Sequence, residues 1–349
     1  MKRFSILIAA LCLCLTGCGK QTTEATAQIF AMDTVMEVAA YGEHAEQAVK
    51  YTEKRIEELE NRLSRTKADS LVSGLNRDGS IRHLTYDYWN LIARAKEYQD
   101  ATNGAFDITI APVMDAWGFT GDSFRVPEQS ELDTLLKKVN SDAIQMLGSP
   151  SDSVTLGEGQ AIDLGGIAKG YTSDCVEAVF YDHEIENGKI SLGGNVFVLG
   201  GKPDGSDWRV GIKDPRNESG LAAILSLRDA YAITSGGYER YFEENGKTYH
   251  HIIDPATGYP ADSGLLSVTV VAADNGPDWA GAGNGAMCDA FSTALFVMGE
   301  EQALDFWRNG GYDFDLVLVT EDGRVVITAG LADRFEEVKD SGYTYETVS

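Results

Sequence analysis

Residues 163–170 read Asp-Leu-Gly-Gly-Ile-Ala-Lys-Gly, and residues 250–260 read His-His-Ile-Ile-Asp-Pro-Ala-Thr-Gly-Tyr-Pro. The first stretch predicts a glycine-rich bend that leads into a helix, with an acid before the bend and a lysine inside it. Such a bend aims backbone N–H groups and a helix N-terminus at an anion, usually a phosphate. The second stretch supplies paired histidines, a carboxylate and a rigid turn. Together they indicate phosphoryl-type transfer on a nucleotide.

The N-terminus has the features of a secretory signal. A short basic start precedes an apolar run from Phe4 to Leu15, which is too short to span a bilayer as a helix. The run ends in Leu-Thr-Gly-Cys at residues 15–18, which resembles a bacterial lipobox; an ordinary secretory signal with an incidental cysteine is the alternative. We expect a signal peptide at residues 1–17, lipid on Cys18, a tether over residues 18–28, and an extracytoplasmic protein anchored to the bacterial cell membrane.

The formal net charge is −25 at pH 7. A chain this acidic repels DNA and RNA, which excludes nucleic acid as a partner. It also repels an anionic nucleotide, so a phosphate substrate needs local lysine, helix dipoles and a divalent cation. Cys175 and Cys288 both fall inside helical patterns, and two such cysteines make neither a disulfide framework nor a zinc site. We expect them to be small buried hydrophobic residues, with a disulfide between them as the alternative.

Hydrophobic periodicity predicts helices and strands along most of the chain. Helices are expected at residues 43–63, 86–100, 128–139, 168–181, 286–298 and 301–309. Strands are expected at residues 35–41, 190–199, 208–212, 222–233, 249–253, 265–273, 314–320 and 325–328, the last two forming a hairpin that closes the chain. Because strands occur in runs, the pattern favours an α+β fold over a doubly wound sheet. A weakly marked boundary at residues 140–160 leaves room for two subdomains.

Asp289 and Thr293 are four residues apart on an expected helix, so their oxygens project from one face. A carboxylate and a hydroxyl, completed by a main-chain carbonyl and phosphate oxygens, suit Mg²⁺. The alternative is an Asp with internal partners and a Thr that bonds back to its own helix.

Asp107 and the two adjacent histidines are further candidates. Asp107 follows an Asn-Gly turn, and its carboxylate has two interpretations, a contact to a ribose or ring edge and a structural cap. His250 and His251 point to opposite faces if they lie in a strand, so at most one of them enters a given site.

These pieces occur in the order of one family. The chain resembles the ApbE family, the FAD:protein FMN transferases, which are often membrane-anchored lipoproteins. The motifs that carry the resemblance are, in chain order, Met32-Asp33-Thr34, Ser64-Arg65, residues 102–107, residues 163–170, Gly193-Gly194-Asn195, Thr234-Ser235-Gly236, residues 251–258, and Asp289 with Thr293. They cover most of the mature chain, and the resemblance assigns residues 29–345 to one flavin transferase domain of mixed sheets packed with helices.

The resemblance implies a reaction with FAD as the substrate. FAD is split at its pyrophosphate, FMN is joined by a phosphoester to a Thr or Ser hydroxyl of an extracytoplasmic acceptor protein, and AMP leaves. By position, Mg²⁺ is held by the carbonyl of Gly166, by Asp289 and by Thr293, and His251 is the base on the acceptor hydroxyl. We expect a neutral His251 near its usual pKa of ~6.5. The implied FAD contacts are Met32, Thr66, Ala105, Phe106, Asp107, Asp163, Lys169 and Ile252.

Thr66 is a departure from the family, which often carries an aromatic residue there that stacks on the flavin. Two alternatives to transfer therefore stay open. One is an FAD pyrophosphatase of the same fold, with water as the acceptor, and the other is a lipid-anchored flavin-binding protein without turnover.

Overall fold

The computed structural model describes residues 23–121, 123–149, 152–277 and 283–349. The expected signal peptide, Cys18 and the first part of the tether lie outside the described residues. Within the described ranges, no helix combines the length and apolar character needed to cross a membrane.

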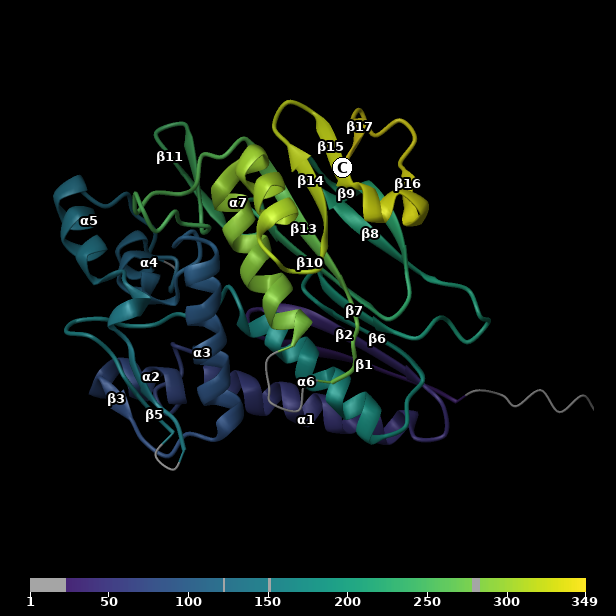
Figure 1. Ribbon diagram of the computed structural model, residues 1–349, viewed down its shortest axis with the longest axis horizontal. Coiled ribbons are helices and arrows are strands. Elements are labelled where there is room, and N and C mark those ends of the chain that lie inside the picture. Colours follow the sequence, from purple (N-terminus) through teal and green to yellow (C-terminus); the bar gives the residue numbers. More distant parts are fainter. Residues whose placement is uncertain (1–22, 122, 150–151, 278–282) are drawn as a thin grey trace, which may run out of the picture.

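A nine-stranded sheet runs through the molecule in the order β1-β2-β6-β7-β10-β13-β14-β15-β17 (Figure 1). Its neighbours pair antiparallel, except that β15 and β17 are parallel. Along β14, Leu316 and Leu318 enter one apolar cluster while Val317 and Val319 enter another, so the sheet is covered on both faces. The strands are β1 (Glu24–Ala31), β2 (Thr34–Tyr41), β6 (Asn187–Leu192), β7 (Asn195–Leu199), β10 (Ala230–Gly236), β13 (Leu265–Ala273), β14 (Asp315–Thr320), β15 (Arg324–Thr328) and β17 (Thr344–Val348).

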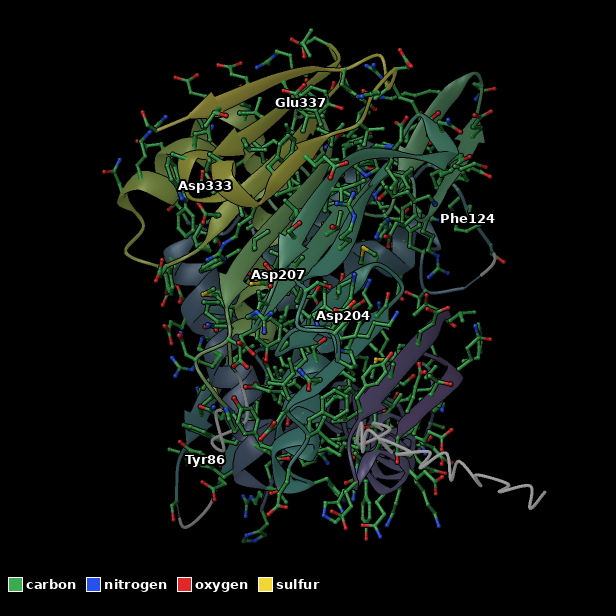
Figure 2. All side chains as sticks on the ribbon, turned by 90° about the vertical axis from the view of Figure 1, so that its right-hand side faces the viewer. Tyr86, Phe124, Asp204, Asp207, Asp333 and Glu337 are labelled. Carbon is green, nitrogen blue, oxygen red and sulfur yellow. The ribbon has the colours of Figure 1, made fainter. Side chains whose placement is uncertain are left out.

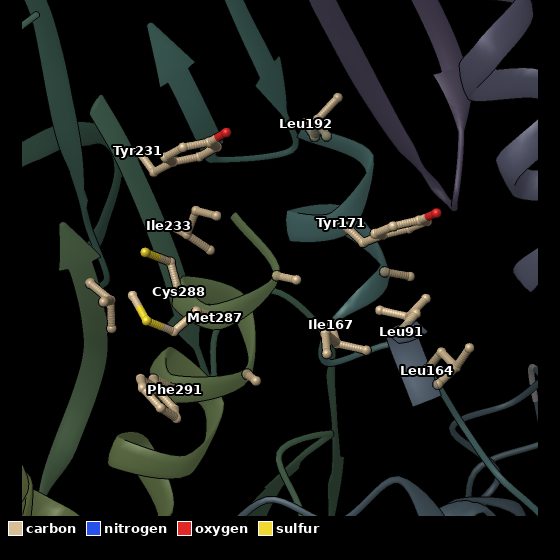
Figure 3. Packing of buried hydrophobic residues seen from close by; sticks show 14 of the residues in the cluster. Leu91, Leu164, Ile167, Tyr171, Leu192, Tyr231, Ile233, Met287, Cys288 and Phe291 are labelled. Carbon is tan, nitrogen blue, oxygen red and sulfur yellow. The ribbon is translucent and has the colours of Figure 1, made fainter. Parts of the chain in front are cut away.

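Three long helices lie against one face of this sheet, and they are α1 (Ala45–Leu63), α6 (Ala168–Asp182) and α7 (Asn284–Asn309); a further long helix, α3 (Tyr86–Ala101), packs against α7. Figure 3 shows the packing, in which Met287 and Cys288 from α7 lie near Ile233 of β10. Cys288 is buried as expected, Cys175 is partly buried, and both are free thiols.

A smaller sheet covers the other face. It consists of β16 (Phe335–Glu337), β9 (Asn217–Leu227) and β8 (Trp208–Asp214), next to the short helix η4 (Ala329–Arg334). Its Trp208 and Leu225 pack with Ala232 and Val319 of the main sheet. The molecule therefore has three layers, and acidic side chains such as Asp204 project from its surface (Figure 2). The expected α+β class is confirmed.

Short elements form a lobe beside the main sheet, at the left of Figure 1. Trp117 donates from Nε1 to the carbonyl of Gly258 at 2.7 Å, which ties this lobe to the turn after the two histidines. The elements are α2 (Leu71–Asp78), β3 (Ser80–Ile81), η1 (Ile108–Ile110), α4 (Ala111–Trp117), α5 (Gln129–Leu135), η2 (Leu136–Lys138), η3 (Ser141–Ala143), β4 (Gln145–Leu147), β5 (Ser153–Thr155), β11 (Tyr241–Glu244) and β12 (Lys247–His250).

The expected tether over residues 18–28 is wrong from Glu24 onward. Residues 24–31 form β1, which pairs with β2 along its whole length. Ala25, Ala27 and Ile29 pack against the main core. A Thr/Ala/Gln-rich stretch has the composition of a linker, but here alternate residues find an apolar surface to cover.

Several element boundaries also differ from the expectation. Residues 190–199 form two strands, because Gly193 and Gly194 both adopt positive φ and turn the chain. Residues 222–233 likewise divide at a turn in which Asp229 has φ 45°. The expected strand at 249–253 ends at His250, the helix at 128–139 becomes α5 and η2, and the two C-terminal helices are one element interrupted at Gly299. The hairpin of β14 and β15 forms, but β17 follows it.

Candidate functional site

The site is built where α6 and α7 meet. Gly170 and Gly285 face one another so closely that a methyl group on Gly170 would overlap the carbonyl oxygen of Gly285 and lie 2.6 Å from Asp289 Cβ. Only glycine permits this approach. The contact brings the glycine-rich bend before α6 next to the first turns of α7.

Each of these helices has its N-terminus capped by a carboxylate of the other. Asp289 on α7 accepts from the backbone N–H of Gly170 at 2.8 Å. Asp174 on α6 accepts from the N–H groups of Gly283, Gly285 and Ala286 at 2.7–2.9 Å. These bonds satisfy amides that have no partner within their own helix.

This arrangement limits the expectation that the amides of the bend face a phosphate. The amide of Gly170, in the first turn of α6, meets Asp289, an anion that the chain itself supplies. The N-cap residue of α6, Ile167, has no polar side chain, so the capping group has to come from elsewhere.

The three predicted metal ligands lie at this junction. A Cβ on Gly166 would be 3.4 Å from Thr293 Oγ1, so the bend passes directly beside that hydroxyl. Asp289 lies one helical turn earlier on the same face of α7. Their oxygens are hard donors of the kind that Mg²⁺ binds together with water and phosphate oxygens. No cluster of three or more His, Cys, Asp or Glu side chains suited to a metal occurs among the described residues, so this site would depend on one carboxylate.

Asn195 supports Asp289 from β7. Its Nδ2 donates to Asp289 Oδ1 at 3.0 Å, while its own Oδ1 is buried without a hydrogen-bond partner. Burial raises the pKa of Asp289, and the positive charge of Lys169 opposes that rise. A buried carboxylate beside an unsatisfied amide oxygen favours a bound cation. The residues present therefore fit the expected metal.

Lys169 lies at the centre of the charged groups. Its Nζ is 3.8 Å from Glu239. Burial raises the pKa of Glu239, and the positive charge of Lys169 opposes part of that rise. The same lysine acts on the titration of Asp289 and of His251. The sequence indicated Lys169 as a site residue but not Glu239. Glu239 comes shortly after the strand end at Thr234-Ser235-Gly236, and no recognisable motif surrounds it.

Ser235 is a second polar partner at the junction. Its Oγ lies 3.2 Å from Thr293 Oγ1 and 2.7 Å from Ser292 Oγ. The sequence left open whether the segment around Ser235 faces phosphate or only turns the chain. In the structure its hydroxyl orients the proposed metal ligand Thr293.

His251 is held by the backbone. Its Nδ1 lies 3.2 Å from the carbonyl of Arg240, and its own N–H donates to the same carbonyl at 3.0 Å. A carbonyl accepts only from a protonated nitrogen, so Nε2 carries the lone pair. Burial, with smaller contributions from Lys169 and His250, lowers the pKa of His251 to about 3. The expectation of a pKa near 6.5 is therefore wrong, although the ring is neutral as expected.

His250 has a different environment. Its Nε2 lies 3.0 Å from the carbonyl of Ala261, its Nδ1 accepts from the N–H of Ile252, and its ring meets Phe296 edge-on. The two histidines thus have separate partners, and His250 fixes the turn that carries the buried Ile252.

Asp107 is occupied by internal partners. Its carboxylate accepts from the N–H and hydroxyl of Thr109 and from the N–H and hydroxyl of Ser141 at 2.5–3.1 Å. It caps η1 through Oδ1, while among the described residues its Oδ2 accepts only from the N–H of Ser141. Its neighbour Phe106 lies against the bend, since a Cβ on Gly166 would be 3.2 Å from the Phe106 ring. Ala105 is partly buried one residue before.

Arg65 is a site residue to which the sequence assigned no role. It donates to Asp163 at 2.9 Å and to both carboxylate oxygens of Asp115 at 2.8 Å. Asp163 in turn accepts from the N–H of Gly165 at 2.8 Å and so shapes the bend. The adjacent Thr66 is exposed, and its hydroxyl lies 3.0 Å from Ser64 Oγ.

Met32 lies in the tight turn between β1 and β2, where Met32 and Asp33 both have positive φ. Its sulfur accepts a weak hydrogen bond from Thr172 of α6 at 3.7 Å. Met32 therefore lies against α6, and Phe106 of the lobe lies against the bend before α6. The hydrogen bonds of Thr66 go to Ser64.

Comparisons with known proteins agree with one another. The profile of the ApbE family matches residues 32–316. A relative from Treponema pallidum (strain Nichols), named FAD:protein FMN transferase, is 30% identical and covers 83% of this chain and 82% of its own. A relative of the same name from Klebsiella pneumoniae (strain 342) is 33% identical, with 82% and 86% covered. The crystal structure of the ApbE protein from Thermotoga maritima superposes with a TM-score of 0.78 at 30% identity, covering 91% of this chain and 97% of that chain.

Proposed function

The chain belongs to the ApbE family, and we propose that it moves FMN from FAD onto a Thr or Ser hydroxyl of an acceptor protein, with Mg²⁺ bound and with release of AMP. It is an enzyme of the flavin transferase class. The observation that supports the proposal is the grouping of His251 and Asp289 around Lys169, whose charge acts on both. We assign His251 as the base, Asp289 as a cation ligand and Lys169 as the positive charge.

The attack on a phosphate needs a proton acceptor and neutralisation of charge. His251 Nε2 is unprotonated at neutral pH and takes the proton of the acceptor hydroxyl. Lys169 provides a positive charge for the phosphates of FAD. Asp289, Thr293 and the carbonyl of Gly166 would hold Mg²⁺, which when bound neutralises phosphate charge and stabilises the leaving AMP.

Supporting residues keep these groups in place. Asn195 and the amide of Gly170 orient Asp289, and the carbonyl of Arg240 orients His251. Arg65 holds Asp163 against the bend. The backbone at residues 105–107, with Met32 and Ile252, would contact FAD.

The test is an incubation of FAD and Mg²⁺ with the enzyme, with and without an acceptor protein that presents an exposed Thr. We expect covalent flavin on the acceptor and stoichiometric AMP, and no AMP without the acceptor. FMN and AMP formed without an acceptor would indicate a pyrophosphatase, and recovery of intact FAD in both reactions would indicate a binding protein.

We further propose that the enzyme acts outside the cytoplasm, anchored by lipid on Cys18. The Leu-Thr-Gly-Cys sequence after a short apolar run supports this. Mass spectrometry should detect an acylated N-terminus at Cys18, and a chain that retains Met1 would contradict the proposal.

A further inference from the structure

A cavity of about 270 Å³ opens beside α6, on the far side of Asp174 from the flavin site. It is bordered by α3, α6, β10, the segment after β13 and the first turn of α7. None of the residues predicted to bind FAD or its metal lines it. Glu177 lines the cavity, and it is seven residues beyond Gly170 on α6, roughly 10 Å along the helix. The cavity is therefore separate from the flavin site.

Glu177 is buried with one oxygen unsatisfied. The residue is only 2% exposed, and it lines the cavity. Its Oε2 accepts from the hydroxyl of Tyr231 at 2.7 Å, whereas its Oε1 has no hydrogen-bond donor. An ionised carboxylate without a partner is costly to bury, so either a proton or a positive group is expected at Oε1.

Asp274 adds a second carboxylate at the same place. It lines the same cavity as Glu177, and its Oδ1 accepts from the N–H of Gly276 at 2.7 Å. Two carboxylates that line one small cavity favour a proton or a cation between them. Burial, and then the contact with Asp274, raises the pKa of Glu177 to about 9. The nearby Arg94 forms an ion pair with Glu97 at 2.7 Å.

We propose that this cavity binds a divalent cation of the Ca²⁺ type, coordinated by Glu177 Oε1 and the carboxylate of Asp274. The side-chain amide of Asn284 is a third oxygen source, because its Nδ2 already donates to the carbonyl of Ala273 at 2.7 Å and its Oδ1 is the remaining acceptor. Ca²⁺ accepts six to eight carboxylate, amide and water oxygens in flexible geometry, whereas Mg²⁺ demands a tight octahedron. Two carboxylates in a roomy cavity therefore favour Ca²⁺, held with a Kd of roughly 10⁻⁴–10⁻³ M as in extracellular modules.

The test is calorimetric titration of Ca²⁺ into the mature chain without FAD. Asp289→Asn is titrated beside the wild type, because it removes the carboxylate of the flavin site and leaves the cavity unchanged. We expect Asp289→Asn to retain one Ca²⁺ site, and Glu177→Gln and Asp274→Asn to weaken it at least tenfold. Glu177→Gln should still fold, because its amide can donate to Asp274 as a protonated carboxyl would.

Glu301→Gln is the matched control, since it removes one negative charge from an exposed position of α7. It should leave Ca²⁺ binding unchanged. Flavin transfer should persist in Glu177→Gln, which separates this proposal from the function of the flavin site. Equal Ca²⁺ affinity in wild type, Glu177→Gln and Asp274→Asn, or no Ca²⁺ site in Asp289→Asn, would overturn the proposal and leave a shared proton as the bridge.

Discussion

At the scale of single residues, His251 shows how a partly buried imidazole is kept neutral in the free enzyme. The carbonyl of Arg240 selects the tautomer, and burial beside Lys169 keeps the ring neutral. With a pKa of about 3, the free enzyme already holds the base in its active form across the physiological range. The pH dependence of kcat/KM reports the ionisations of the free enzyme.

We therefore expect the pH profile of kcat/KM for FAD to show no titration with a midpoint near pH 6.5. Transfer to an acceptor protein, measured between pH 5.5 and 7.5 at constant ionic strength, checks this. A clear inflection near 6.5 that disappears in His251→Ala would show that the imidazole titrates normally in the free enzyme.

The two histidines should differ when each is removed. His251→Ala should slow transfer by roughly 10²–10⁴-fold, the usual share of a general base, with FAD affinity almost unchanged. His250→Ala removes hydrogen bonds and a contact to Phe296, so it should lose about 1–3 kcal/mol of stability and little activity in the folded fraction. In-gel flavin fluorescence of the acceptor and FAD titration measure the two effects. Loss of FAD binding as the main defect of His251→Ala would contradict the assignment.

Asn195 should act on the metal through Asp289. Removing such a supporting partner typically costs 10–100-fold in metal affinity, and we expect Asn195→Ala to weaken Mg²⁺ by that amount. Asn187→Ala is the control, because Asn187 lies on the same hairpin and donates to the carbonyl of Gly201 at 2.8 Å. The Mg²⁺ dependence of transfer measures the effect. A similar Mg²⁺ dependence in both variants would show that Asn195 has only a structural role.

At the scale of elements, the reciprocal caps make α6 and α7 one unit. Asp289 caps the N-terminus of α6, and Asp174 caps the N-terminus of α7. Neither helix can therefore shift without breaking a cap. Burial raises the pKa of Asp174 to about 7, and the three backbone donors oppose that rise. The same contacts that stabilise the pair also fix the rotamer of the proposed metal ligand.

The glycine contact between these helices gives a direct test. Gly170→Ala should destabilise the fold by about 1–3 kcal/mol or more, because its methyl group overlaps backbone that cannot move away. It should also weaken Mg²⁺ by displacing Asp289. Gly74→Ala in α2 is the control, since the nearest atom to its Cβ is the end of Arg77 at 3.8 Å, and it should be neutral or stabilising. Thermal unfolding checks both, and equal stability would show that α6 and α7 can separate freely.

The sequence predicted long elements better than the turns between them. The helices at residues 86–100 and 168–181 and the strand at 265–273 stand as expected, because their periodicity is sustained. The segments 190–199 and 222–233 were each predicted as a single strand, although Gly193-Gly194 and Arg228-Asp229 interrupt their apolar residues at the turns that the structure shows. Nothing local to Asp289 indicated that it caps α6, since its partner Gly170 is distant in sequence. For Asp107 a structural cap was one of the two interpretations, and the partner that makes it a cap of η1 is the nearby Thr109.

At the scale of the whole molecule, the site depends on segments from the whole chain. Motif order proposed candidate residues for the site, but polar partners such as Arg65, Glu239 and Ser235 could not be given a role without the fold. The N-terminal strand shows the same point. Its composition indicates a tether, yet it forms an edge of the main sheet and ends in the turn that presents Met32.

Two truncations distinguish a strand from a tether. A chain that starts at Thr23 keeps β1 and should match the mature enzyme in unfolding temperature and FAD affinity. A chain that starts at Met32 loses β1, exposes the edge of β2 and frees the turn whose positive φ values only the β1–β2 pairing maintains. We expect the shorter chain to unfold at lower temperature, to aggregate, and to bind FAD more weakly although Met32 is present. Thermal unfolding and FAD titration of both chains measure this, and wild-type FAD affinity in the shorter chain would show that residues 24–31 serve only as a connection to the anchor.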